Sequence, residues 1–229
     1  MTSNPSPAYV GRVSAAFADN GAGVRGDMGA VVKAVLLDPE ARDPSKIDDP
    51  AFGKVREPFV RWVQIGRTFH ATSDSGRFRH FGGDEDTDIL QQYPFFSPSV
   101  FNFFSPFHQP AGALAQAGLT APELEIIHAF TSIATVNRIS DAVFEGEYLF
   151  DRFEDPIYLE LEGELEVLEE NGPVALVDRL DLLLTYGTLG AETRRAVLDA
   201  ILPLDGEPWD QLHMALFLIL ICPEYAVLR

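Results

Sequence analysis

The sequence predicts an all-α protein, and three observations support this prediction. Apolar residues recur three or four positions apart in every strongly patterned segment, which is the spacing of one helix face. Helix-start residues precede several of these segments. Hydrophobic residues make up 46% of the 229 positions, enough for a substantial core. We therefore expect one helical domain over residues 1–229, an irregular bundle of about seven to nine helices with a long Pro/Phe-rich loop packed across it.

The first two helices are predicted by apolar spacing alone. One face comprises Met28, Val31, Val32, Val35 and Leu36. A second face, at steps of four, three and seven, comprises Val55, Phe59, Trp62 and Phe69. Pro58 is compatible with this second helix, predicted over 54–70, only if the helix begins there.

Arg56 and Glu57 lie just before Pro58, next to an apolar helix. The simplest interpretation is a structural ion pair, or Arg56 capping the carbonyls of a neighbouring helix. Recognition of an anion by Arg56 is the functional alternative.

Residues 71–122 are expected to form a long irregular loop with one short helix, because they carry five prolines and no sustained periodicity. Ser97 and Pro98 fit the N-cap and first positions of that helix, so that Phe96 and Phe101 would form a hydrophobic staple. Five phenylalanines lie between residues 95 and 104, and their burial would contribute roughly 8 to 15 kcal/mol. We expect them to fill the helical core, with an apolar groove or a permanent partner surface as the alternative. Asn102, among them, needs a hydrogen-bond partner.

The next helix is predicted over 121–143, because Thr120 and Glu123 have the spacing of a capping box. Its expected buried stripe comprises Ile126, Ile127, Phe130, Ile133 and Ala134. Residues 145–170, which we interpret as an acidic insertion, hold eleven acids and one base, Arg152. Like charges at this density favour a solvated helix face or a mobile excursion, and cation binding is the alternative.

The C-terminal third predicts three further helices. Asn171, Gly172 and Pro173 mark a turn. The helix that follows has Leu176, Leu180, Leu183 and Leu184 on one face. Two more helices are expected at about 191–202 and 208–221.

Composition excludes several classes of function. The formal charge of −18 opposes binding to nucleic acid. The longest apolar run, Met214 to Cys222, is too short to span a membrane. The single cysteine permits no intrachain disulfide and no thiolate-rich metal site. The first ten residues, MTSNPSPAYV, do not have the pattern of a secretory signal.

Motifs for metals and cofactors are weak or incomplete, so neither a metal nor a cofactor is predicted. Glu125 and His128 have the E-x-x-H spacing of dinuclear sites, but this unit occurs once and is imitated only weakly by Asp210 and His213. We interpret His128 as a helix-face histidine with a hydrogen-bond partner. Residues 82–88, GGDEDTD, lack the spacing of a calcium loop, and a charged turn is favoured over a calcium site.

Seven ordered blocks along the chain resemble the C-terminal half of the bacterial family called domain of unknown function 1800. They read NPSPAYVGRV, GDMGAVVKAVLLDPEAR, FGKVREPFVR, SPSVFNFFSP, GLTAPELEI, LVDRLDLLLTYGTL and ICPEYAVLR. The resemblance implies a helical, generally exported protein of the periplasm or cell envelope, with no established activity. It also implies that the family's N-terminal helical half is missing here and that Met1 begins within the domain. The chain would then be a fragment or a truncated gene product.

Three hypotheses about function follow. The leading one is a non-catalytic partner or assembly module of the cell envelope, binding the missing N-terminal half or a companion envelope protein. The second is an enzyme, or half of one, with a pocket between the 71–122 loop and the helices at 54–70 and 121–143. Arg56, Glu57, Asn102 and His128 would line that pocket. The third is a cation-dependent surface protein.

Overall fold

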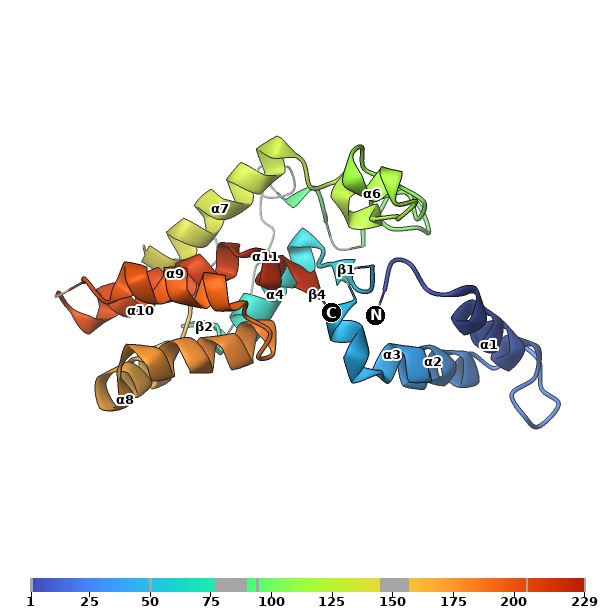
Figure 1. Cartoon of the computed structure of the whole chain (residues 1–229), viewed down its shortest axis with the longest axis horizontal. Helices are drawn as coiled ribbons and strands as arrows, with labels where there is room; N and C mark the ends of the chain where they lie inside the picture. The colour runs from blue at the N-terminus through green and yellow to red at the C-terminus, as the bar shows by residue number, and fades with distance from the viewer. Residues whose placement is uncertain are drawn as a thin grey trace. The chain divides into compact units, whose positions relative to one another are not determined.

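The computed structural model describes residues 2–49, 51–76, 90–93, 95–144, 157–204 and 206–228 (Figure 1). Within these ranges the chain is helical, with ten α-helices and four strands of two residues each. This confirms the all-α prediction, and the ten α-helices are slightly more than the seven to nine expected. Seven of them have ten or more residues.

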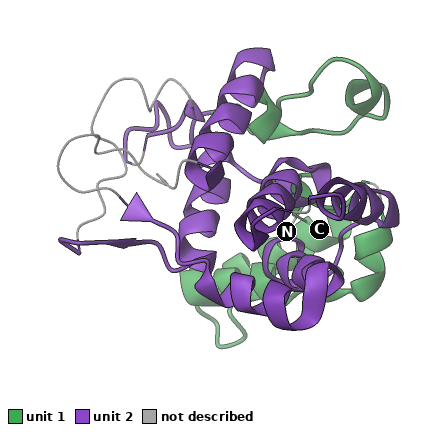
Figure 2. Ribbon diagram, turned by 90° about the vertical axis from the view of Figure 1, so that its left-hand side faces the viewer, with its two compact units in different colours: residues 1–55, 104–125, 227–229 green, residues 56–103, 126–226 purple. Residues whose placement is uncertain are grey.

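The chain divides into two compact units, each assembled from separate stretches of sequence (Figure 2). Unit 1 comprises residues 1–55, 104–125 and 227–229, and unit 2 comprises residues 56–103 and 126–226. The expectation of a single helical domain over 1–229 stays a prediction.

Unit 1 is built around a pair of helices, α1 (Pro7–Ala18) and α2 (Met28–Leu37). It also contains α3 (Pro39–Arg42), the 3-10 helix η1 (Pro44–Asp48), α6 (Ala113–Gln116) and the 3-10 helix η2 (Pro122–Glu125). Strand β1 (Lys54–Val55) pairs antiparallel with β4 (Val227–Leu228), so the C-terminal end of the described chain belongs to this unit.

Polar contacts hold α1 against the segment that follows α2. The guanidinium of Arg12 donates two hydrogen bonds to Asp38, at 2.6 and 2.7 Å. Ser6, the N-cap of α1, donates to Glu40 through its backbone N–H and its hydroxyl. The hydroxyl of Tyr9 donates to the carbonyl oxygen of Val35. These contacts fix the first forty residues as one helical hairpin.

Unit 2 contains the longer helices. They are α4 (Pro58–Thr68), α7 (Ala129–Phe144), α8 (Glu162–Leu180), a π-helix labelled η3 (Asp181–Thr185), α9 (Ala191–Ile201), α10 (Pro208–Ile221) and α11 (Pro223–Ala226). Strand β2 (Thr72–Ser73) pairs antiparallel with β3 (Ile157–Tyr158).

Helix α10 is the centre of the unit 2 core, because α7, α8, α9 and α11 all pack against it. Its inward face comprises Leu212, Ala215, Leu216, Ile219 and Leu220, each fully buried. The predicted leucine stripe of α8 and η3 meets this face, with Leu176, Leu180 and Leu184 also fully buried. The helices predicted at 191–202 and 208–221 are therefore confirmed in place and in type.

Helix α8 is two helical segments joined at Gly172, whose φ of 85° and ψ of 176° are not helical. A left-handed φ is accessible to glycine at little cost, and Pro173 then begins the second segment. The predicted turn at 171–173 is thus a kink rather than a loop. The first segment lies in the acidic insertion, where Leu168 and the carboxylate of Glu164 are buried and Glu162, Glu169 and Glu170 face solvent. Residues 145–156 lie outside the described residues.

The predicted start of the helix at 121–143 is wrong, because the groups of the capping box have other partners. The hydroxyl of Thr120 donates to the carbonyl oxygen of Ser3 at 3.0 Å, and Glu123 pairs with Lys54 at 3.5 Å. Residues 122–125 form only η2, and α7 begins at Ala129. The expected stripe is wrong too, since Phe130 and Ile133 are exposed and the buried positions of α7 are Thr131, Ile139, Ala142 and Val143.

The helix expected after Ser97 is also absent, and SPSVFNFF forms a tight turn in the described chain. Ser99 and Asn102 form an antiparallel bridge, with Asn102 at a left-handed φ of 75°. The hydroxyl of Ser99 accepts from the backbone N–H of Phe101, a local bond that competes with helix formation. Among the described residues of this loop, Ala113–Gln116 form the short helix α6.

None of the helices in the described ranges combines the length and the apolar character needed to cross a bilayer.

Candidate functional site

Glu57 links the start of α4 to the segment that carries the phenylalanines. Its Oε2 atom accepts from Nε2 of Gln92 at 2.7 Å and from Nδ2 of Asn102 at 2.8 Å. The side-chain oxygen of Gln92 in turn accepts from the backbone N–H of Phe59, in the first turn of α4. One carboxylate therefore holds both ends of residues 92–102, and Asn102 has the hydrogen-bond partner it requires.

The residues between these two anchors are exposed. We call residues 95–101 the aromatic segment; Phe95, Phe96, Val100 and Phe101 all face solvent, with Val100 94% exposed. Phe103 and Phe104 are half-buried, and none of the five phenylalanines belongs to the core cluster. The expectation that they fill the core is wrong, because a turn anchored at its base projects its tip outwards.

The sequence around the aromatic segment lacks charged residues, a feature that an analysis of apolar periodicity does not detect. From residue 90 to residue 122 there is no Asp, Glu, Lys or Arg, in a chain that is 23% charged. Solvent-facing loops normally carry charge, so a charge-free stretch with exposed phenylalanines is typical of a binding surface.

A second group of interest is the arginine–tyrosine cluster of unit 2, which we define as Arg56, Arg61, Gln64, Tyr186 and Tyr225. The guanidinium of Arg56, a residue only 4% exposed, lies 5.3 Å from the ring centre of Tyr186 and 5.2 Å from that of Tyr225. It donates to Oε1 of Gln64 and, at 3.4 Å, to the carbonyl oxygen of Leu184. Arg56 thus lies at the last turn of η3, between two aromatic rings.

Arg61 approaches the same tyrosine. Its guanidinium lies 5.4 Å from the ring centre of Tyr225, and its Nη2 donates to the carbonyl oxygen of Leu220 at 3.3 Å. The hydroxyl of Tyr225 donates to the carbonyl oxygen of Arg61 at 2.6 Å. Burial lowers the pKa of Arg61, an effect that Tyr225 opposes and that neighbouring Arg56 reinforces.

The backbone around Tyr186 is distorted to bring its ring to Arg56. Residues 181–185 form a π-helix, and Tyr186 follows it at a left-handed φ of 61°. Both features carry an energetic cost and are found most often at functional positions. Tyr186 is 59% exposed, and its hydroxyl accepts from Nε2 of Gln64 at 3.3 Å. The cluster is therefore accessible to solvent at one edge, where Gln64 and Tyr186 lie.

The four residues predicted to line a pocket have different environments. Glu57 and Asn102 are hydrogen-bonded to each other, and Arg56 lies next to Glu57 in sequence but binds Gln64 and Leu184. His128 is exposed and stacks on Phe130, with 6.4 Å between ring centres. Two cavities of about 460 and 450 Å³ lie along α1 and α2 in unit 1, and none of the four residues lines them. The predicted pocket, and with it the enzyme hypothesis, stays a prediction.

Within the described part of the chain, no group of three or more His, Cys, Asp or Glu side chains is placed to hold a metal ion. His80 and the 82–88 stretch considered for calcium lie outside the described residues. Cation binding by the acidic segments also stays a prediction.

Sequence reasoning missed most of the arginine–tyrosine cluster and the role of Gln92. Arg61 and Gln64 are three positions apart on one helix face, which was a usable signal for a shared polar site. Tyr186 follows η3 and Tyr225 lies in α11, elements that are distant in sequence, so only the fold brings the two tyrosines together.

The comparisons with known proteins identify a family but no activity. No curated protein matches the chain, and no solved structure matches it. The family model described as protein of unknown function, DUF1800, matches residues 1–227. The chain therefore belongs to the DUF1800 family.

Proposed function

We propose that the protein is a non-catalytic assembly module of the bacterial cell envelope, and that its aromatic segment binds a helical protein partner. The partner to which we commit is the N-terminal half of the family domain. The observation that carries the proposal is the exposure of Phe95, Phe96 and Phe101 within a charge-free stretch.

The chemistry of this stretch defines the partner surface. Burying an exposed phenylalanine contributes roughly 1.5 to 3 kcal/mol, so three of them supply enough free energy for a specific contact. A partner surface lacking charge fits a segment lacking charge. A second copy of the chain fits less well, because two molecules of formal charge −18 repel each other.

Exposed helix faces support a helical partner. In unit 2, Phe130, Ile133 and Val136 are exposed at three-residue steps on α7. In unit 1, α2 exposes Met28, Val32 and Leu36 at four-residue steps. Apolar rows at these spacings are the ridges that pack into the grooves of another helix.

The proposal is tested by titrating the full chain with the separately produced N-terminal half in a calorimeter. We expect binding with a negative heat-capacity change, as burial of apolar surface requires. The triple variant Phe95→Ser, Phe96→Ser, Phe101→Ser should weaken binding at least tenfold, since 1.4 kcal/mol corresponds to a factor of ten.

The matched control is Leu202→Ser, which removes an exposed apolar side chain at the end of α9. This variant should bind as the unsubstituted chain does. Equal affinities for the triple variant and the control would show that the aromatic segment is not the contact. Self-association of the chain in place of binding would identify a second copy as the occupant.

A further inference from the structure

We propose that the arginine–tyrosine cluster is a binding site for an oxyanion, a carboxylate or a phosphate group, which contacts the two guanidiniums at the edge marked by Gln64 and Tyr186. This inference is independent of the proposed partner surface, because no residue of the aromatic segment belongs to the cluster. Arg61 and Gln64 lie on α4, Tyr225 lies on α11, Arg56 precedes α4 and Tyr186 follows η3.

The first argument is charge. Arg56 and Arg61 bring two cations to one aromatic ring, and across the described residues neither guanidinium has a carboxylate within 4 Å. The nearby carboxylate of Glu57 instead accepts the amides of Gln92 and Asn102. Taking an unpaired cation out of water costs several kcal/mol, which a bound anion would offset.

The second argument is unused hydrogen-bonding capacity. A guanidinium has five N–H donors in a rigid fork. Arg56 donates through Nη1 to Gln64 and Leu184, and Arg61 donates through Nη2 to Leu220. The Nε atom of Arg61 is buried and has no hydrogen-bond partner. An oxyanion supplies several acceptors at once, in the bidentate geometry that arginine favours.

The third argument is preorganisation. Tyr225 is fully buried and is fixed by its bond to the carbonyl oxygen of Arg61. The rings of Tyr186 and Tyr225, with centres 5.3 and 5.2 Å from the guanidinium of Arg56, help to hold this cation in place. The left-handed Tyr186 at the end of a π-helix is the strained element of this arrangement.

A purely structural role, in which both arginines cap helix C-termini, accounts for only part of the charge. Arg56 reaches the carbonyl of Leu184 at 3.4 Å and Arg61 that of Leu220 at 3.3 Å, both long bonds. Each helix C-terminus carries about half a negative charge. Two such ends leave about one positive charge of the pair uncompensated.

The test is thermal unfolding of the full chain in sodium chloride, sodium phosphate and sodium acetate at matched ionic strength. Ligand binding to the folded state raises Tm in a saturable way, by mass action. A saturable rise with phosphate assigns the site to phosphate groups, and a rise with acetate assigns it to carboxylates. No rise beyond that in chloride with either anion would overturn the proposal.

Two variants localise the effect. Arg61→Lys keeps the charge but removes the fork, and Gln64→Ala removes the acceptor that orients the guanidinium of Arg56, so each should raise the apparent Kd about tenfold. The control is Arg195→Lys, at an exposed arginine of α9. If Arg61→Lys does not fold, Gln64→Ala decides the test. An anion effect unchanged in the variants that fold would place binding elsewhere and overturn the assignment.

Discussion

At the scale of single residues, Glu57 is the side chain that we expect to matter most for holding the aromatic segment in place. It accepts two amide hydrogen bonds from opposite ends of residues 92–102. Hydrogen bonds to a charged group contribute about 1.5 to 3 kcal/mol each. Its removal should therefore release the aromatic segment while the helical core stays folded.

The variant Glu57→Gln tests this role. We expect faster amide hydrogen exchange at residues 95–104, with little change in α10, because the two amides that hold the loop lose their charged acceptor. The exposed Glu169→Gln on α8 is the matched control and should leave exchange unchanged. Equal protection of residues 95–104 in both variants would show that Glu57 is not the anchor.

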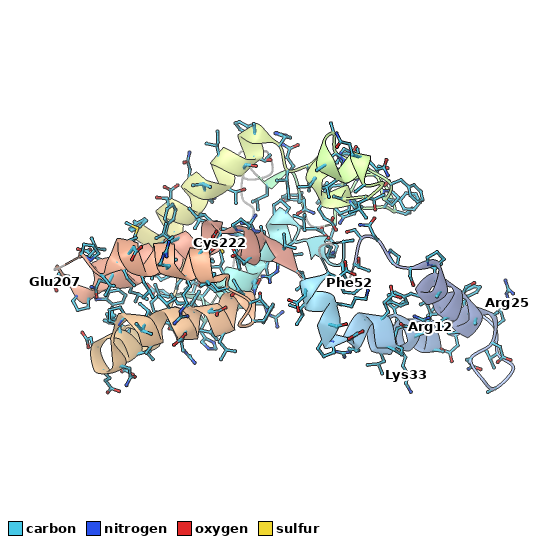
Figure 3. All side chains as sticks on the ribbon, viewed as in Figure 1. Arg12, Arg25, Lys33, Phe52, Glu207 and Cys222 are labelled. Atoms are coloured by element: carbon cyan, nitrogen blue, oxygen red, sulfur yellow. The ribbon has the colours of Figure 1, made fainter. Side chains whose placement is uncertain are left out.

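Cys222 provides a test of burial at the end of α10 (Figure 3). Burial, the largest cause, raises the pKa of this thiol to about 11, and the neighbouring carboxylate of Glu224 contributes. We expect slow alkylation by iodoacetamide at pH 8 in the folded protein and complete alkylation in urea, measured by mass spectrometry. Rapid alkylation of the folded chain would contradict the burial of Cys222.

The same shift predicts how stability depends on pH. In the unfolded chain the thiol loses its proton near pH 9, whereas in the folded chain it keeps the proton until about pH 11. The unfolded state therefore binds fewer protons between these values, so the free energy of unfolding falls as pH rises from about 9 to 11. Urea titrations of the Cys222→Ala variant should show a smaller decrease over that range.

At the scale of elements, α8 shows which sequence features predicted the fold well. The Asn-Gly-Pro signal and the leucine stripe after it were predicted correctly, because Gly172 is required by its backbone and the leucines face one core. Turn residues such as glycine indicate the backbone conformation that a position requires, and apolar periodicity indicates which face of a helix is buried.

A pair of glycine variants in α8 separates backbone conformation from packing. No atom lies within 4 Å of a Cβ added at Gly163 or at Gly172, but only Gly172 has a positive φ, of 85°. Gly172→Ala should destabilise the protein by about 1 to 3 kcal/mol, because this combination of φ and ψ is one that essentially only glycine adopts. Gly163→Ala should stabilise it by up to about 1 kcal/mol, since alanine favours helix. Urea denaturation measures both, and equal effects would contradict the kink.

Two elements were predicted wrongly for a shared physical reason. The start of α7 and the SPSVFNFF segment were assigned as helix because Ser, Thr, Pro and Glu occupy capping positions there. Thr120 instead bonds to Ser3, and Ser99, two residues after the predicted cap Ser97, accepts from the backbone N–H of Phe101. When a side chain has several possible hydrogen-bond partners, tertiary contacts determine which partner it binds. A single sequence does not reveal those contacts.

The candidate site was predictable only in part, for a related reason. Arg56, Glu57 and Asn102 stood out as polar residues beside apolar ones, and the structure gives each of them a hydrogen-bond partner. The sequence did not single out Arg61, Tyr186 and Tyr225, because their association depends on how α4, η3 and α11 pack. His128 was selected by motif spacing, and it stacks on Phe130.

At the scale of the whole molecule, charge and apolar exposure are separated along the chain. The formal charge is −18, yet residues 90–122 contain no Asp, Glu, Lys or Arg. A formal charge of this size makes copies of the chain repel one another, and we propose that the charge-free stretch binds one partner.

Exposure of the aromatic segment also predicts a stability result. The triple variant Phe95→Ser, Phe96→Ser, Phe101→Ser should change the free energy of unfolding by less than about 1.5 kcal/mol in total, since exposed positions contribute within about 0.5 kcal/mol each. Leu216→Ala, in the core of unit 2, should cost about 2 to 5 kcal/mol. A triple variant that loses as much stability as Leu216→Ala would mean that the phenylalanines are core residues.

The most direct test of a partner-binding role is the solution mass of the chain by light scattering, alone and with the N-terminal half of the family domain added. We predict 25.2 kDa for the chain alone and, after mixing, a stable species with the summed mass of the two polypeptides. A chain that stays at 25.2 kDa in the presence of excess N-terminal half would contradict the account.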